Sequence, residues 1–153
     1  VMEGTIGRPL RYEPGSGAAG GSLFGLLAIA DRFASFEVRP GVDVAMELTG
    51  FDRAVTAADL VLTGEGKVDD QTSFGKTAMG VAERARAAGA RTLCFGGGVT
   101  PDGAEFMHSI GVVTMPVTER PMSLEECVAA GTAPIARAAG RAALLVDLGG
   151  TLA

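Results

Sequence analysis

Three carboxylates and a lysine lie within six residues of the chain, at Glu65, Lys67, Asp69 and Asp70. They follow a short apolar run, residues 59–63, that is typical of a buried parallel strand. Open α/β sheets bind ligands beyond the carboxyl ends of such strands. Carboxylates there could hold Mg²⁺ or deprotonate a hydroxyl, and a lysine could neutralise phosphate, as phosphoryl transfer requires. The alternative is a charged surface loop.

Glycines and a second lysine add to this segment. Gly64 and Gly66 would let the backbone approach a ligand closely. Residues 75–77 imitate the end of the phosphate-binding pattern G-x-x-x-x-G-K-[ST], but Asp70 stands where its first glycine should be and would repel phosphate. Lys76 is still predicted on the first turn of a helix, where it can meet a phosphate. The alternative for Lys76 is an ordinary solvated charge.

A second glycine-rich segment, residues 15–20, satisfies the pattern G-x-G-x-x-G. Dinucleotide binding requires a preceding strand and an acidic residue about twenty positions later. Pro9 and Pro14 disrupt that strand, and no acid ends a strand at the required distance. Two compatible interpretations remain: close helix packing through small residues, or an anion held by the helix N-terminus at Ser16 and Gly17.

The hydrophobic periodicity predicts alternating helices and strands after an irregular lead-in at residues 1–15. Helices are expected at 16–30, 42–48, 76–88 and 101–109, and from Ser123 onward in one long helix kinked at Pro134. Strands are expected at 59–63, 91–95 and 111–117, with a polar loop at 64–73, a triple glycine at 96–98 ending the second strand, and a capping box at Ser123 and Glu126.

This alternation predicts an α/β fold, a three-layer Rossmann-like parallel sheet with helices on both faces, in a single domain at residues 16–153. Three strands make a narrow sheet. We therefore expect the chain to be an incomplete part of a larger two-domain protein.

Composition excludes several classes of protein. With 47% hydrophobic and 20% charged residues, the chain can bury a core and is not predicted to be disordered. A net charge of −5 argues against nucleic-acid and membrane-surface partners, which need a basic face. Cys94 and Cys127 lie in apolar stretches and are expected to be free thiols in a reducing compartment. A cytoplasmic globular protein is predicted.

Four segments together resemble the bacterial glycerate kinase family. The segment at 58–82, ADLVLTGEGKVDDQTSFGKTAMGVA, resembles the family signature, with Ala78 in place of its usual proline. Similar segments are GSGAAGGSLFGLL at 15–27, RPGVDVAMELTGFD at 39–52 and PMSLEE at 121–126. The four occur in the family's order across most of the chain. Family members are expected to be about twice this long, with this chain as their C-terminal portion.

The resemblance implies phosphorylation of D-glycerate with ATP and Mg²⁺. It assigns Asp69, rather than Asp70, as the general base or a Mg²⁺ ligand, Glu65 as a helper, and Lys76 as a residue that neutralises phosphate. The residues expected to bind substrate or phosphate are Ser16, Gly17, Gly64, Gly66, Lys67 and Gln71. A missing N-terminal half or a second copy would be needed, and the chain alone is expected to be inactive. The alternative is a non-catalytic ligand-binding or regulatory module.

Overall fold

The computed structural model describes residues 7, 9–69 and 77–151, with side chains to residue 149. The chain divides into two compact units, Val1–Arg39 and Pro40–Ala153. These units are defined by their internal packing, and the predicted domain boundary after residue 15 stays a prediction.

The first unit differs from the regular helix that the sequence predicted from Ser16. It contains the short 3-10 helices η1 (Leu10–Tyr12) and η2 (Ala30–Arg32) and the helix α2 (Ala18–Leu27). Within α2, Ala19, Gly20 and Gly21 have φ values of 51°, 69° and 88°. Glycine enters this left-handed region readily. The regular right-handed turns therefore begin only after Gly21.

The second unit contains a parallel sheet in the order β1-β2-β3, formed by β1 (Leu60–Val68), β2 (Arg91–Val99) and β3 (Val112–Pro116). All three predicted strands are confirmed, but two are longer than expected. Glu65 pairs with Gly96, and Lys67 with Gly98. The prediction of a loop from Gly64 and of a strand ending at Phe95 was wrong, because the triple glycine gives the polar segment a partner for its backbone groups.

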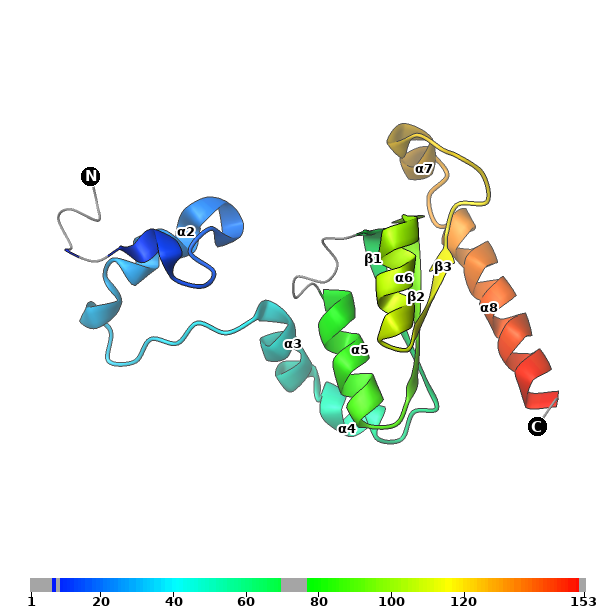
Figure 1. Cartoon of the computed structure of the whole chain (residues 1–153), viewed down its shortest axis with the longest axis horizontal. Coiled ribbons are helices and arrows are strands. Elements are labelled where there is room, and N and C mark those ends of the chain that lie inside the picture. The colour runs from blue at the N-terminus through cyan, green and yellow to red at the C-terminus, as the bar shows by residue number, and fades with distance from the viewer. Residues whose placement is uncertain (1–6, 8, 70–76, 152–153) are drawn as a thin grey trace. The chain divides into compact units, whose positions relative to one another are not determined.

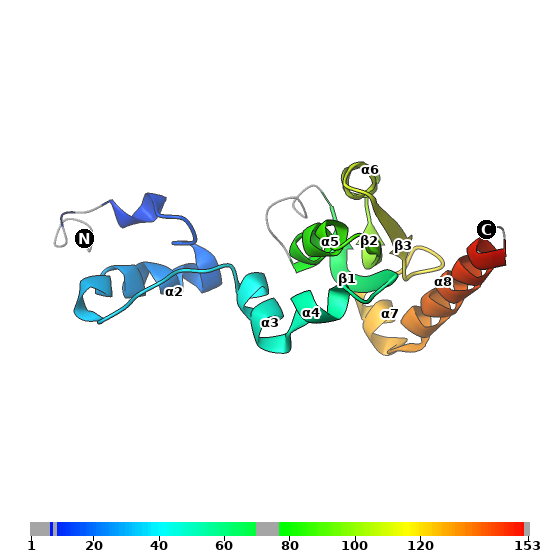
Figure 2. The ribbon, with the colours of Figure 1, turned by 90° about the horizontal axis from the view of Figure 1, so that it is seen from below.

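Helices cover both faces of this sheet (Figures 1 and 2). The helices of the second unit are α3 (Gly41–Thr49), α4 (Phe51–Val55), α5 (Thr77–Ala87), α6 (Pro101–Ser109), α7 (Leu124–Ala129) and α8 (Ala133–Thr151). α5 and α6 pack on one face, and α8 packs on the other. As predicted, α3 ends at Gly50, whose φ of 68° is left-handed.

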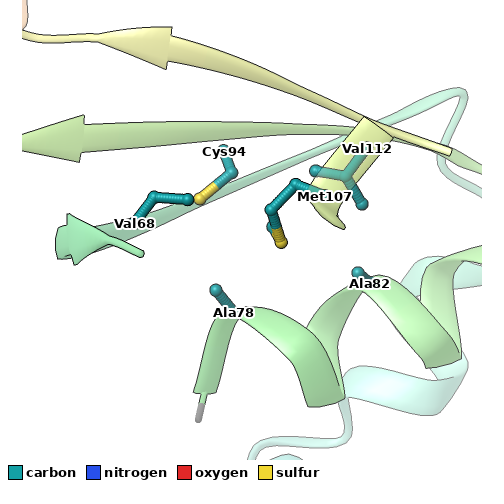
Figure 3. Close-up of a cluster of buried hydrophobic side chains, with 6 residues drawn as sticks. All are labelled: Val68, Ala78, Ala82, Cys94, Met107 and Val112. Carbon is teal, nitrogen blue, oxygen red and sulfur yellow. The ribbon is translucent and has the colours of Figure 1, made fainter. Parts of the chain in front are cut away.

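Among the described residues, the largest buried cluster lies between the sheet and the pair α5 and α6 (Figure 3). Its buried members are Val68, Ala78, Ala82, Cys94, Met107 and Val112. Met107 and Val68 are both 0% exposed, so α6 is anchored directly over the end of β1. A second cluster joins α4 and α5 to Val61, and a third joins α8 to Leu93 and Phe95.

The coverage of the α8 face is incomplete. Leu62 and Val113 remain 58% and 60% exposed. An open cavity of about 810 Å³ lies between the sheet and the second half of α8, where Leu145 and Val146 line it. None of the helices in the described part of the chain has the length and hydrophobicity needed to cross a membrane.

The C-terminal region forms two helices where the sequence predicted one. The capping box is confirmed: the N–H of Glu126 donates to Oγ of Ser123 at 3.1 Å, and the N–H of Ser123 donates to the Glu126 carboxylate at 2.7 Å. The backbone N–H of Ser123 and then Arg120 lower the pKa of Glu126. Gly131 ends this helix with a φ of 60°. Pro134 lies in the first turn of α8, where its missing N–H costs little.

Candidate active site

The candidate active site lies at the carboxyl end of β1, on the face covered by α5 and α6. Glu65 is half-buried and pairs with Gly96. A Cβ on Gly96 would lie 3.1 Å from Cγ2 of Val68, which belongs to the core cluster under these helices. Paired residues of neighbouring strands point to the same face. Glu65 therefore points toward the α5 and α6 side of the sheet.

The electrostatics of a neighbouring thiol agree with this orientation. Burial raises the pKa of Cys94 to about 11, and the negative charge of Glu65 adds to that rise. Cys94 is fully buried and free, and Cys127 is also free. Cys94 therefore acts as a small core residue, as the sequence predicted.

Lys67 and Asp69 form an ion pair at the end of the strand. Nζ of Lys67 lies 3.1 Å from Oδ2 of Asp69, and the two side chains are 64% and 13% exposed. The sequence predicted that a lysine would point toward the acidic residues, and Lys67 does so. The ammonium compensates the negative charge of a carboxylate that the fold has largely removed from water.

The first turn of α6 is bonded to the same strand end. The N–H of Thr100 donates to the carbonyl of Val68 at 2.9 Å, and its hydroxyl lies 3.4 Å from that oxygen. The N–H of Gly103 donates to Oγ1 of Thr100 at 3.2 Å, which makes Thr100 the N-cap of α6. The sequence pattern predicted this helix, but Thr100 was not among the predicted residues. A threonine directly before Pro101 was the available signal.

The remaining predicted site residues fall into three groups. Gly64 and Gly66 lie within β1 rather than in a loop. Lys76 and Gln71, like Asp70, lie outside the described residues. Ser16 and Gly17 belong to the first unit, where the Ser16 hydroxyl donates to the carbonyl of Arg11 at 3.0 Å.

The close-packing interpretation fits Gly15, where a Cβ would lie 3.1 Å from Cδ2 of Leu23, but it does not fit the three glycines that follow. A Cβ built on Gly17, Gly20 or Gly21 would meet nothing within 4 Å. That interpretation was wrong for these positions. The expected regular helical turn starting at Ser16 is also absent, because Ala19 to Gly21 are left-handed. Anion binding at Ser16 and Gly17 stays a prediction.

A cluster of charges follows β3. Nε of Arg137 lies 2.9 Å from Oε2 of Glu119, and Arg141 lies 2.6 Å from Oε1 of the same residue. The hydrogen bond from Arg137, followed by the charge of Arg137 and the contacts of Arg141, lowers the pKa of Glu119. These contacts tie the loop after β3 to the first half of α8.

In the part of the chain that the structure describes, no three acidic, histidine or cysteine side chains gather as a metal site would require. Glu65 lies within β1, and Asp69 directly follows Val68, the last residue of that strand.

Several relatives of this chain are named as glycerate kinases. "Glycerate kinase" of Halalkalibacterium halodurans is 35% identical over 146 residues, which are 95% of this chain and 37% of that protein. "Glycerate kinase" of Bacillus cereus is 37% identical over 114 residues, which are 74% of this chain and 29% of that protein. "Glycerate 2-kinase" of Escherichia coli is 30% identical over 114 residues, which are 74% of this chain and 29% of that protein.

A solved structure has a similar fold. The crystal structure of a protein assigned as glycerate kinase 2 from Salmonella typhimurium LT2 matches with a TM-score of 0.62 and 25% identity, over 98% of this chain and 37% of that chain. The chain thus spans about a third of the length of the relatives it matches. This share is smaller than the half that the sequence predicted.

The sequence model of the glycerate kinase family matches residues 1–147, nearly the whole chain. The named relatives, the solved structure and this match agree with one another. The chain belongs to the glycerate kinase family.

Proposed function

We propose that this chain is part of a cytoplasmic enzyme that transfers the γ-phosphoryl group of ATP to a hydroxyl of D-glycerate, giving phosphoglycerate and ADP. One observation carries the proposal. In a chain of the glycerate kinase family, the carboxylate of Asp69 is only 13% exposed and is held by Lys67 at the carboxyl end of a parallel strand. A ligand beyond this sheet edge would meet a preoriented base.

In the proposed reaction, the glycerate hydroxyl oxygen forms a bond to the γ-phosphorus while the bond from that phosphorus to the bridging oxygen breaks. The hydroxyl proton passes to the carboxylate of Asp69, and ADP leaves with the electron pair of the broken bond. Lys67 orients Asp69 through their 3.1 Å contact. Because phosphoryl transfer depends mostly on positioning and charge, such an arrangement is suited to it.

We propose that a carboxylate at the end of β1 takes part in binding a magnesium ion. Mg²⁺ is usually bound through one or two protein carboxylates together with substrate phosphates and water. In the alternative role for Asp69, its carboxylate would be a ligand of the ion instead of the base, Glu65 would assist with the metal or the substrate, and the bound ion would reduce the negative charge on the phosphates of ATP. Glu65 is held within the paired part of β1, so its position is set by the sheet.

The other predicted residues have supporting roles in this proposal. Lys76 would neutralise phosphate from the segment after β1, and Gln71 would contact substrate there. Gly64 and Gly66 would admit the substrate close to the backbone of β1. Ser16 and Gly17 would bind an anionic group through main-chain N–H groups.

The chain spans about a third of the length of its relatives, so we propose that activity also needs chain beyond these 153 residues. The test is to express the complete reading frame and, separately, the 153 residues alone, and to supply each with ATP, Mg²⁺ and D-glycerate. Phosphorus NMR would detect phosphoglycerate and distinguish phosphorylation at the 2-hydroxyl from that at the 3-hydroxyl.

We expect D-glycerate-dependent ADP formation by the complete protein, with L-glycerate as the control substrate, and none by the 153 residues alone. Binding of D-glycerate or ATP by the complete protein without turnover would instead identify a non-catalytic ligand-binding module. Turnover by the 153 residues alone would show that the additional chain is not required.

A further inference from the structure

The first turn of α6 rests directly on the backbone of Asp69. A Cβ built on Gly103 would lie 2.6 Å from the carbonyl oxygen of Val68 and 2.7 Å from both N and Cα of Asp69. Real Cβ atoms do not approach backbone atoms this closely, and backbone atoms cannot turn aside as a flexible side chain can. Gly103 is helical and buried, so lack of a side chain, rather than conformational freedom, is what this position requires.

Two further features hold the helix in this place. Thr100 caps the N–H of Gly103 and donates its own N–H to Val68, so the helix start and the strand end share hydrogen bonds. Met107, one turn after Gly103 on the same side of α6, is fully buried beside Val68. Hence α6 cannot move away from Asp69 without opening the core cluster and the hydrogen bonds together.

The geometry points to Gly103 as a positioning residue for the Asp69 carboxylate. We propose that contact between the backbones of Gly103 and Asp69 fixes the point from which the Asp69 side chain leaves the strand end, while Lys67 fixes its tip. This inference rests on the proposed function, in which Asp69 is the base. A base displaced by about 1 Å can lose about 100-fold in rate, so a small shift of this backbone would be measurable.

The test compares Gly103→Ala with Gly140→Ala in the complete protein. Gly140 lies within α8, and a Cβ there would meet nothing within 4 Å. A glycine-to-alanine change inside a helix normally favours the helix, so Gly140→Ala should leave turnover unchanged. Gly103→Ala should lower kcat by about 10-fold to 100-fold and leave KM for ATP and D-glycerate within about 2-fold.

A double-mutant cycle separates positioning from a general loss of fold. In an Asp69→Asn background, Gly103→Ala should cause no further loss of kcat, because the group it positions is already absent. Equal losses in both backgrounds, or normal kcat in Gly103→Ala, would overturn the inference. Normal kcat in Asp69→Asn alone would instead overturn the assignment of Asp69 as base, and with it the positioning role.

A measurement that does not depend on turnover tests the contact of Gly103 separately from the role of Asp69 as base. Hydrogen exchange at the Thr100 amide, which donates to Val68, should become faster in Gly103→Ala and stay unchanged in Gly140→Ala. Unchanged exchange would show that the contact does not require glycine and would also overturn the inference. If Gly103→Ala does not fold, Thr100→Val removes the cap while keeping the backbone bond. The same cycle with Asp69→Asn then applies, with the same expected and contrary outcomes.

Discussion

Nζ of Lys67 and Oδ2 of Asp69 lie 3.1 Å apart, although the lysine side chain is 64% exposed and the aspartate side chain only 13%. The pair therefore joins a solvent-facing cation to a carboxylate enclosed by the end of β1 and the start of α6. An ion pair with one exposed partner adds little stability, about 0–1 kcal/mol. Its consequence is orientation of Asp69 rather than support of the fold.

This finding predicts that Lys67 affects turnover more than stability. Lys67→Gln removes the charge and retains most of the length, so the free energy of unfolding should change by less than about 1 kcal/mol. Turnover should fall by about 10-fold, which corresponds to about 1.4 kcal/mol of transition-state stabilisation. Urea denaturation and steady-state kinetics of the complete protein would measure the two effects. Lys67→Arg, which keeps the charge, is the control, and normal turnover in Lys67→Gln would contradict the role.

The close approach of Gly97 in β2 to Gly66 in β1 predicts that alanine will have different effects at the two positions. A Cβ on Gly97 would lie 2.5 Å from the carbonyl oxygen of Gly66, whereas a Cβ on Gly66 would meet nothing within 4 Å. Gly97→Ala should therefore destabilise the protein by about 1–3 kcal/mol, as overpacking does. Gly66→Ala should leave the free energy of unfolding within about 1 kcal/mol of the wild type, because the added methyl group meets no neighbour and only restricts the unfolded chain. Equal urea midpoints for the two variants would show that the strands do not approach this closely.

The Glu119 cluster predicts a specific dependence of stability on pH. Arg137 and Arg141 lower the pKa of Glu119 from its ordinary 4.5, so the folded state favours the ionised carboxylate. Its stabilising contribution is present above pH 4.5 and is lost as the pH falls through the lowered pKa. Glu119→Gln should reduce the free energy of unfolding at neutral pH. It should also weaken the dependence of that free energy on pH in acid, so the values for the variant and the wild type should converge at low pH.

Denaturation series at several pH values would measure these curves. Glu105→Gln, which removes an exposed carboxylate of α6, is the matched control. Added salt should shrink the difference between Glu119→Gln and the wild type, because exposed ion pairs are screened. A difference that persists unchanged to low pH would mean that the Glu119 charge is not responsible.

Local patterns predicted much of the fold. The apolar runs before Gly64 and after Gly89 predicted two strands, and the capping box at Ser123 and Glu126 predicted a helix start that the structure confirms. These features depend on residues near one another in sequence. Periodicity and capping are therefore enough to find them.

Features that depend on contacts across the sheet could not be predicted. The segment from Gly64 to Lys67 contains the turn-favouring, polar residues of a loop, and only pairing with the triple glycine makes it a strand. The role of Gly103 likewise depends on its contact with Asp69, 34 positions earlier in the chain. Composition indicated that the segment after residue 59 carries the chemistry, but pattern alone could not show that Thr100 and Gly103 hold it.

The turnover of Asp69→Asn in the complete protein tests the central claim most directly. This substitution keeps the size of the side chain and removes its basicity and charge. Loss of a general base typically costs about 10²–10⁴-fold, so kcat at saturating ATP, Mg²⁺ and D-glycerate should fall by at least about 100-fold. Asp70→Asn should be much milder. Near-normal kcat in a folded Asp69→Asn enzyme would contradict the account and leave Asp69 as a residue that orders the end of β1.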